Sequence, residues 1–285
     1  MSSKERAKST PKAGRNLPVA IGVGVALFLV FAVGLIWVNW LFIAAMAVGL
    51  CLAAIELHRA LLIKQMRSEI VPIAIGTVVS VLGGYGVSRF DLYLSPIAFV
   101  VSCLGATVLA ALTARLARGA QGFIRDIAAS ALIIAYIPLL GSFVPLMMGA
   151  EQGAMRVLTV IIVVILSDTG AYAVGVLFGR HKMAPTISPG KTWEGFAGSL
   201  LFAIVGGALA MHLLLGAPWW IGALLGALLS PAATLGDLVE SLIKRDAGLK
   251  DMSNFLPGHG GVMDRLDSML VAVPVGWLVL QLALG

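Results

Sequence analysis

The sequence predicts an all-α, polytopic integral membrane protein with about nine transmembrane helices. Hydrophobic residues make up 59% of its 285 residues and charged residues only 12%, and the mean hydropathy is +0.99. Its apolar segments run for about twenty residues, the length that an α-helix needs to cross a hydrocarbon core roughly 30 Å thick. These segments are continuous, whereas a transmembrane β-barrel would show alternating polar and apolar residues. The composition also excludes a soluble two-domain protein.

The N-terminal half supplies five predicted spans. Residues 1–16 are polar and basic, and we expect them to form a cytoplasmic tail before an uncleaved first span. The apolar region 17–62 is too long for one helix and is divided at Trp37 and Trp40, which favour a membrane interface. The third span is predicted over residues 70–88, the fourth ends near residue 113 and the fifth near residue 148. Residues 17–155 are therefore expected to form a transmembrane scaffold.

The C-terminal half supplies four more spans. The sixth is predicted over residues 157–178 and the seventh ends near residue 216. The eighth leads into a charged stretch that begins at Asp237, and the ninth covers residues 263–284. The polar loop GRHKMAPTISPGKTWE joins the sixth span to the seventh. Because the chemically informative residues lie here, residues 156–285 are expected to form a catalytic transmembrane domain with cytoplasmic loops.

Lysine and arginine fall almost entirely on one side of this topology. Of the 20 basic residues, 18 lie in the N-terminal tail or in loops on the same side, and only Arg89 and Arg156 lie opposite. By the positive-inside rule, the N-terminus is cytoplasmic and the C-terminus is outside. The short loops favour a prokaryotic inner membrane. The net charge of +6 follows from this topology and from attraction to anionic lipids, so no nucleic-acid partner is expected.

Charge is densest between Asp237 and Asp267, beside long apolar segments where carboxylates are costly. Its polar residues recur at helical spacing and share a helix face at the end of the eighth span and the start of the ninth. They are Asp237, Glu240, Ser241 and Lys244, then Asp264 and Asp267. Two carboxylate faces brought together suit Mg²⁺, which completes its shell with water and phosphate oxygens.

Basic residues are mixed with these acids, and they are Lys244, Arg245, Lys250 and Arg265. They would repel a bare metal but suit a metal–polyphosphate complex, so the mixture indicates a nucleotide. The intervening PGHGG contains His259, which could donate to a phosphate or cap the turn, and glycines whose N–H groups can approach a phosphate. Alternatively, the aspartates only stabilise a helix N-terminus and the Lys-Arg pair only sets the topology.

A second polar group lies at the end of the sixth span and in the following loop. Asp168 lies one or two turns inside an apolar helix, where a carboxylate needs a cation, a wet cavity or hydrogen bonds to neighbouring helices. Ser188, Lys191 and Thr192 in SPGKTWEG are candidate phosphate ligands. This segment is not a P-loop, because Pro185 stands where a glycine is required and no strand is expected before it.

Three further acidic residues receive structural interpretations. Glu56 ends the second span and is expected at the membrane interface rather than in the site. Asp126 is expected to pair with a nearby arginine, and Glu194 to cap the helix that follows it.

These segments resemble the phosphatidate cytidylyltransferase (CDP-diacylglycerol synthase) family. Its signature S-x-[apolar]-K-R-x4-K-D-x-[small]-x2-[apolar]-P-x-H-G-G-[apolar]-x-D-R-[apolar]-D is met over residues 241–267. The family's G-D-L-x-E-S is found at 236–241, its D-x-x-A-Y at 168–172 and its S-P-x-K-T-x-E-G at 188–195. One departure is Gly190, where many relatives have a second lysine. The resemblance covers about residues 165–270.

The resemblance implies transfer of CMP from CTP to phosphatidate, with Mg²⁺ as cofactor, giving CDP-diacylglycerol and pyrophosphate. On this basis the catalytic residues are Asp237, Asp264, Asp267, Lys244 and Asp168. Asp237 and Asp264 are assigned as the principal Mg²⁺ ligands, with Asp267 and Glu240 in support. Contacts to CTP or lipid phosphate are assigned to Ser188, Lys191, Thr192, Ser241, Arg245, Lys250, His259 and Arg265. Asp168 is expected to orient a lysine or bind a second cation, since the family is also associated with K⁺. It is associated with homodimers too, for which residues 17–155 are the expected contact region.

Other classes stay open as alternatives. A CTP-dependent lipid kinase would release CDP, whereas a cytidylyltransferase acting on another lipid phosphate would release pyrophosphate. A cation-coupled transporter could use Asp168 and Asp237, but the sequence shows no internal repeat. The D-G-x2-A-R-x8-G-x3-D-x3-D motif of CDP-alcohol phosphatidyltransferases is absent from the sequence.

Overall fold

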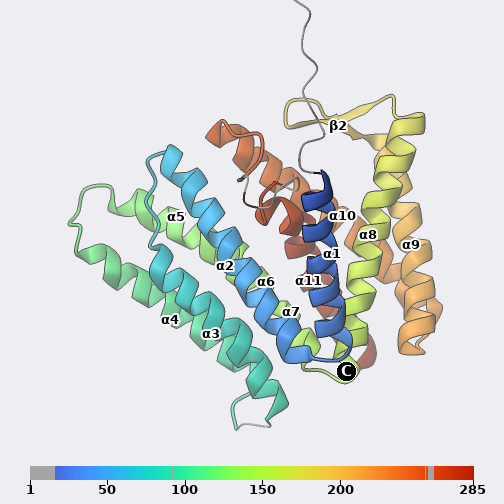
Figure 1. The fold of residues 1–285 in the computed structure, drawn as a ribbon, viewed down its shortest axis with the longest axis horizontal. Coiled ribbons are helices and arrows are strands. Elements are labelled where there is room, and N and C mark those ends of the chain that lie inside the picture. The colour runs from blue at the N-terminus through green and yellow to red at the C-terminus, as the bar shows by residue number, and fades with distance from the viewer. Residues whose placement is uncertain (1–16, 91–92, 254, 256–259) are drawn as a thin grey trace, which may run out of the picture.

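The computed structural model describes residues 17–90, 93–253, 255 and 260–285, and it is a bundle of long helices (Figure 1). The first helices are α1 (Leu17–Ile36), α2 (Asn39–Ile63), α3 (Ile70–Arg89), α4 (Pro96–Leu116) and α5 (Phe123–Tyr136). Two short helices, α6 (Pro138–Gly141) and α7 (Phe143–Met148), precede α8 (Gly153–Phe178). The remaining elements are β1 (Lys182–Ala184), β2 (Ser188–Thr192), α9 (Trp193–Leu215), α10 (Trp219–Ala247) and α11 (Met263–Leu284). The predicted all-α membrane fold is confirmed.

Eight helical segments in the described part of the chain are long and apolar enough to cross a membrane. One of them, Phe123–Met148, is composed of α5, α6 and α7. It is interrupted where Pro138 begins α6, because proline has no N–H to continue the hydrogen bonds of α5. α1 is a further apolar helix, and the order of segments agrees with the predicted order. The predicted count of nine spans stays a prediction, as does the tail 1–16, which lies outside the described residues.

The loop predicted between the sixth and seventh spans contains a small antiparallel hairpin. β1 pairs with β2 so that Lys182 lies opposite Thr192 and Ala184 opposite Ser188. The expectation that no strand precedes SPGKTWEG is therefore wrong. The expected helix cap is also wrong, because the Oγ1 of Thr192, not Glu194, accepts the N–H of Gly195 at 3.1 Å.

Helices α8, α9 and α10 pack closely beside this hairpin (Figure 1). A Cβ on Gly207 or Gly222 would lie about 2 Å from the other's carbonyl oxygen, so only glycine permits this approach of α9 to α10. The buried hydroxyls of Ser167, Ser199 and Ser230 then connect the three helices, at oxygen–oxygen distances of 2.6 and 2.8 Å. These contacts fix the middle of α8, where Asp168 follows Ser167, relative to α10.

The two basic residues predicted opposite the others lie at the other end of the bundle from the hairpin. Arg156 near the start of α8 donates to the carbonyl oxygen of Gly285 at 3.3 Å. Arg89 ends α3 and lines a small cavity with Gln152, which precedes α8. The C-terminus and the hairpin lie at opposite ends of the fold (Figure 1). The predicted charge asymmetry is therefore present, while the side that faces the cytoplasm stays a prediction.

Candidate active site

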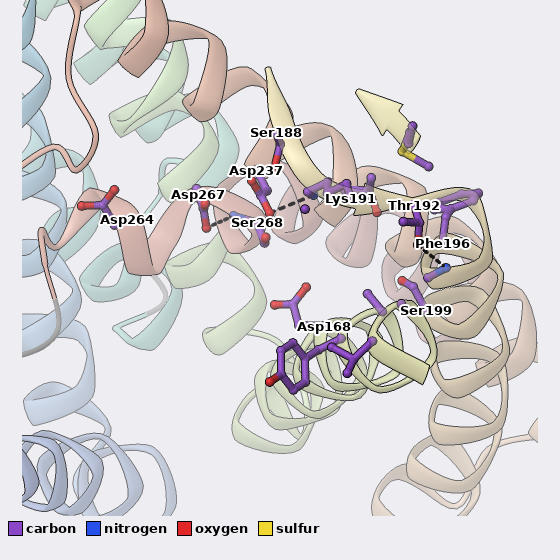
Figure 2. Close-up of a pocket in the computed structure, with 18 residues that line it drawn as sticks. Asp168, Ser188, Lys191, Thr192, Phe196, Ser199, Asp237, Asp264, Asp267 and Ser268 are labelled. Carbon is purple, nitrogen blue, oxygen red and sulfur yellow. Dashed lines mark hydrogen bonds and ion pairs between the residues drawn. The ribbon is translucent and has the colours of Figure 1, made fainter. Parts of the chain in front are cut away.

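A cavity of about 550 Å³ lies where α8, the hairpin, α9, α10 and α11 meet (Figure 2). Its charged lining residues are Asp168 on α8, Lys191 on β2, Asp237 on α10, and Asp264 and Asp267 on α11. All five were singled out from the sequence. The fold thus brings together residues that are up to about a hundred positions apart.

The hairpin places the ammonium group of Lys191 beside the carboxylate of Asp237 on α10. The Nζ of Lys191 lies 2.8 Å from Oδ2 of Asp237, and both side chains are partly exposed to the cavity. Ser188 and Thr192, also predicted, line the same wall. Arg245 lies outside the cavity lining, and its Nε donates to the carbonyl oxygen of Ile187 at 3.3 Å, which connects the hairpin turn to α10. Lys191 is therefore positioned to pair either with a carboxylate or with an anion that enters the cavity.

A second lysine supports the carboxylate at the start of α11. The Nζ of Lys244 donates to Oδ1 of Asp264 at 2.7 Å and also pairs with Glu240, which is fully buried. The other oxygen of Asp264, Oδ2, accepts the N–H of Gly261 at 2.9 Å and that of Met252 at 3.0 Å. Both oxygens of Asp264 are thus already hydrogen-bonded.

Several predicted residues do not line the cavity. Ser241 donates its hydroxyl to Oδ1 of Asp237 at 3.2 Å and so orients that carboxylate from behind. The others that do not line it are Glu240, Lys244, Arg245, Lys250 and Arg265, of which the last three are exposed. His259 lies outside the described residues.

The sequence prediction for Glu56 is wrong. Glu56 on α2 is only 3% exposed and reaches the start of α11. Its Oε1 accepts from Oγ of Ser253 at 2.5 Å and from the N–H of Val262 at 3.0 Å, and its Oε2 accepts from the N–H of Met263 at 2.8 Å. A carboxylate at a helix N-terminus satisfies N–H groups that have no partner within the helix. The cost of a carboxylate in an apolar helix, which drew attention to Asp168, was the available signal.

The backbone of Gly261 fills the space between the carboxylates of Glu56 and Asp264. A Cβ on Gly261 would lie 2.7 Å from Oε2 of Glu56 and 2.8 Å from Oδ2 of Asp264. Only glycine therefore lets the backbone pass between the two acids. Glu56 fixes the first turn of α11, and that turn carries Asp264.

The carboxylates of the cavity can be tested for their fit to Mg²⁺. Within the described ranges, no three His, Cys, Asp or Glu side chains converge closely enough to form a ready-made metal site. Mg²⁺ commonly binds through only one or two carboxylates, with water and substrate phosphates completing the shell. Asp168, Asp237 and Asp267 all face the cavity, so the donor set fits a cation that enters together with a phosphate compound.

Apolar and aromatic residues form one side of the cavity. Tyr172 and Val176 line it from α8 and Phe196 from α9. Tyr172 and Val176 are also highly exposed on the surface of membrane-spanning α8. The cavity therefore combines a charged side, formed by the hairpin, α10 and α11, with an apolar side around Tyr172, Val176 and Phe196.

Fold and site together define an integral membrane enzyme with an amphipathic, phosphate-suited cavity at one end of its helices. The chain belongs to the cytidylyltransferase family, whose model matches residues 18–283. It is 38% identical to the phosphatidate cytidylyltransferase of Mycobacterium leprae over 298 residues, covering 98% of this chain and 92% of the relative. Identity to the protein of the same name from Mycobacterium bovis is 39% over 295 residues, with coverages of 98% and 93%. A Haemophilus influenzae phosphatidate cytidylyltransferase is 44% identical over 128 residues, 43% of this chain and 44% of the relative. The predicted family and its transferase class are confirmed.

Proposed function

We propose that the protein transfers CMP from CTP to phosphatidate, forming CDP-diacylglycerol and pyrophosphate for phospholipid synthesis. One observation carries this proposal: a single cavity combines four aspartates and Lys191 with an apolar wall on a membrane-spanning helix. The polar part suits a nucleotide triphosphate with its cation, and the apolar part suits the chains of a lipid. The names of the relatives support the same reaction.

The reaction joins two anions and needs no nucleophilic side chain. A phosphate oxygen of phosphatidate attacks the α-phosphorus of CTP, the bond to the β-phosphate oxygen breaks, and pyrophosphate leaves. Charge neutralisation and positioning dominate transfers of this kind. Lys191 would exchange its contact with Asp237 for a phosphate oxygen, and the hairpin would hold Ser188 and Thr192 beside the same phosphates. Lys244 would keep Asp264 in place.

We also propose that Mg²⁺ is the cofactor. Asp237 and Asp267 would hold it, since both line the cavity. Oδ1 of Asp267 accepts the N–H of Ser268, and Oδ2 of Asp237 pairs with Lys191, which would release it on turning to a phosphate. The sequence assigned Asp264 as a principal ligand, but its oxygens already accept three hydrogen bonds, so we give it a supporting role. When bound, Mg²⁺ supplies positive charge to the triphosphate. Asp168 would take a second cation, for which K⁺ is the candidate.

The proposed assembly and location follow the same reasoning. We place the cavity on the cytoplasmic side of a bacterial plasma membrane, because the opposite end carries Arg89 and Arg156 while the basic loops lie at the cavity's end. The bacterial origin of the relatives agrees with this location. A homodimer through residues 17–155 and the absence of a nucleic-acid partner are further parts of the proposal.

The decisive experiment uses the purified full chain in detergent with phosphatidate, CTP and Mg²⁺, and follows pyrophosphate and the lipid product. We expect pyrophosphate release that requires phosphatidate, matched by CDP-diacylglycerol and abolished by Asp237→Asn. As a control, Asp246→Asn changes an exposed acid that forms an ion pair with Lys64 at the surface, and this variant should retain activity. Release of CDP would indicate a lipid kinase instead. Ion flux in sealed vesicles without nucleotide turnover would indicate a transporter.

A further inference from the structure

A second cavity, of about 510 Å³, lies where α4 ends and α5 begins. Four arginines line it, Arg67, Arg115, Arg118 and Arg125, together with Asp126. We call it the arginine cavity. Among the described residues it shares no lining residue with the active-site cavity. α4 and α5 lie at the opposite edge of the bundle from α8, α9 and the hairpin (Figure 1).

One buried ion pair forms the rigid part of the arginine cavity. Arg115 is 1% exposed, and its Nε donates to Oδ2 of Asp126 at 2.9 Å. Its two other nitrogens donate to the carbonyl oxygens of Gly119 at 2.8 Å and Gln121 at 2.6 Å. Arg115 therefore has a protein partner for each of its nitrogens, and the predicted pairing of Asp126 with a nearby arginine is confirmed.

The other three arginines of the cavity are less fully paired than Arg115. Arg118 pairs with Glu69 and lies 3.6 Å from Asp126, whereas the exposed side chains of Arg67 and Arg125 have no ion pair within the described part of the chain. An ideal Cβ on Gly122 would lie 3.4 Å from Nη2 of Arg125 and 3.9 Å from Nη2 of Arg115, so both nitrogens lie near one point that this glycine leaves open. Gly122 has φ = 69°, a backbone conformation that glycine adopts without strain. The cavity thus combines a fixed wall with two arginines that lack acidic partners.

The positive-inside rule does not explain why four arginines line one cavity. Basic residues in a cytoplasmic loop set orientation without any particular geometry. Four guanidinium groups surround this cavity, but only one carboxylate among the described residues lines it. The cavity therefore carries an excess of positive charge. Guanidinium groups bind phosphate oxygens in paired hydrogen bonds, and basic pockets between transmembrane helices bind lipid head groups.

We propose that the arginine cavity binds the phosphate group of an anionic ligand, and that this phosphate belongs to a phospholipid head group. The lipid source is favoured because apolar residues flank the cavity in the chain, with Leu116 at the end of α4 and Ile124 at the start of α5 exposed at 67% and 84%. They would contact acyl chains while the arginines contact the head group. The site does not depend on the proposed catalytic function.

The test measures binding of dioctanoyl phosphatidylglycerol to the purified full chain in detergent, from the dependence of the thermal unfolding midpoint on lipid concentration. The variants are Arg67→Gln with Arg125→Gln, and the charge-preserving pair Arg67→Lys with Arg125→Lys. Arg59→Gln is the matched control, since Arg59 is exposed and does not line the arginine cavity. Inorganic phosphate and dioctanoylglycerol, which lacks phosphate, are the comparison ligands.

We expect saturable stabilisation of the unmodified chain and of Arg59→Gln, with the Kd about tenfold or more weaker in the double glutamine variant because charge-assisted hydrogen bonds are lost. The double lysine variant should bind with intermediate affinity. Equal affinity of the glutamine variant and the unmodified chain would overturn the site, as would equal stabilisation by dioctanoylglycerol. If inorganic phosphate bound as tightly as the lipid, and lost affinity in the same variant, the phosphate site would stand and its lipid source would be wrong.

Discussion

Replacing Glu56 by glutamine should slow the transfer reaction, although Glu56 does not line the active-site cavity. Its carboxylate accepts three hydrogen bonds, from Ser253, Val262 and Met263. Glutamine keeps the shape but only one acceptor oxygen, and its NH₂ group would face a donor. A hydrogen bond to a charged group contributes about 1.5–3 kcal/mol, and a buried donor left without a partner costs about 1–3 kcal/mol. The start of α11 should therefore lose about 2–4 kcal/mol of local stability.

The lower stability at the start of α11 should slow the reaction by displacing Asp264. Asp264 comes directly after Met263, and its Oδ1 lies 2.7 Å from the Nζ of Lys244. A displacement of about 1 Å in an active site can cost about a hundredfold in rate. We expect kcat for pyrophosphate release to fall about 10- to 100-fold in Glu56→Gln, and further in Glu56→Ala.

The assay is pyrophosphate release at saturating CTP and phosphatidate, with the thermal unfolding midpoint of each variant measured alongside. Asp246→Asn is the control, because it removes an exposed acid at the same end of the protein and should change neither quantity. Unchanged kcat and midpoint in Glu56→Gln would refute the reasoning altogether. A lower midpoint with unchanged kcat for the folded protein would show that Glu56 only stabilises α11.

Three further predictions use other contacts. Gly261→Ala should reduce turnover about tenfold or more, because its Cβ would lie 2.7 and 2.8 Å from two carboxylate oxygens. The control Gly49→Ala, whose Cβ meets nothing within 4 Å, should leave turnover unchanged, and equal rates for both variants would contradict the contact. Lys191→Ala should raise KM for CTP and lower kcat, since it removes the basic side chain of the hairpin wall, and normal CTP kinetics would exclude that role. Asp126→Ala should lower stability by about 3–5 kcal/mol by leaving Arg115 buried without its carboxylate, as measured by denaturant unfolding in detergent; a loss below about 1 kcal/mol would contradict it.

The order of the membrane-spanning helices could be predicted because long apolar segments report directly on burial in lipid. The cavity aspartates could be predicted too, since Asp264 and Asp267 recur at helical spacing and Asp168 interrupts an apolar helix. Each of these signals lies within one stretch of sequence. They require no knowledge of which helices are neighbours.

The contacts that the sequence did not predict depend on residues far apart in the chain. Glu56 is about 200 positions from the backbone that it caps, and no local pattern reports that α2 packs against α11. The hairpin was missed for another reason: β1 has three residues and β2 has five, too few to show an alternating pattern within a polar loop. Lys191 was chosen for its charge, but its pairing with Asp237 depends on that hairpin.

The charge of the active-site cavity gives an independent reason to expect a cation requirement. Four aspartates line it, and the only lysines in contact with them are Lys191 and Lys244, within the residues that the structure describes. Formal negative charge therefore exceeds positive charge, and a free triphosphate would be repelled at short range. A divalent cation that enters with the nucleotide would offset both the aspartates and the triphosphate. The acidic lining and an anionic substrate are thus compatible only when a cation accompanies the substrate, which is why we expect CTP binding itself, and not only turnover, to be lost when Mg²⁺ is chelated.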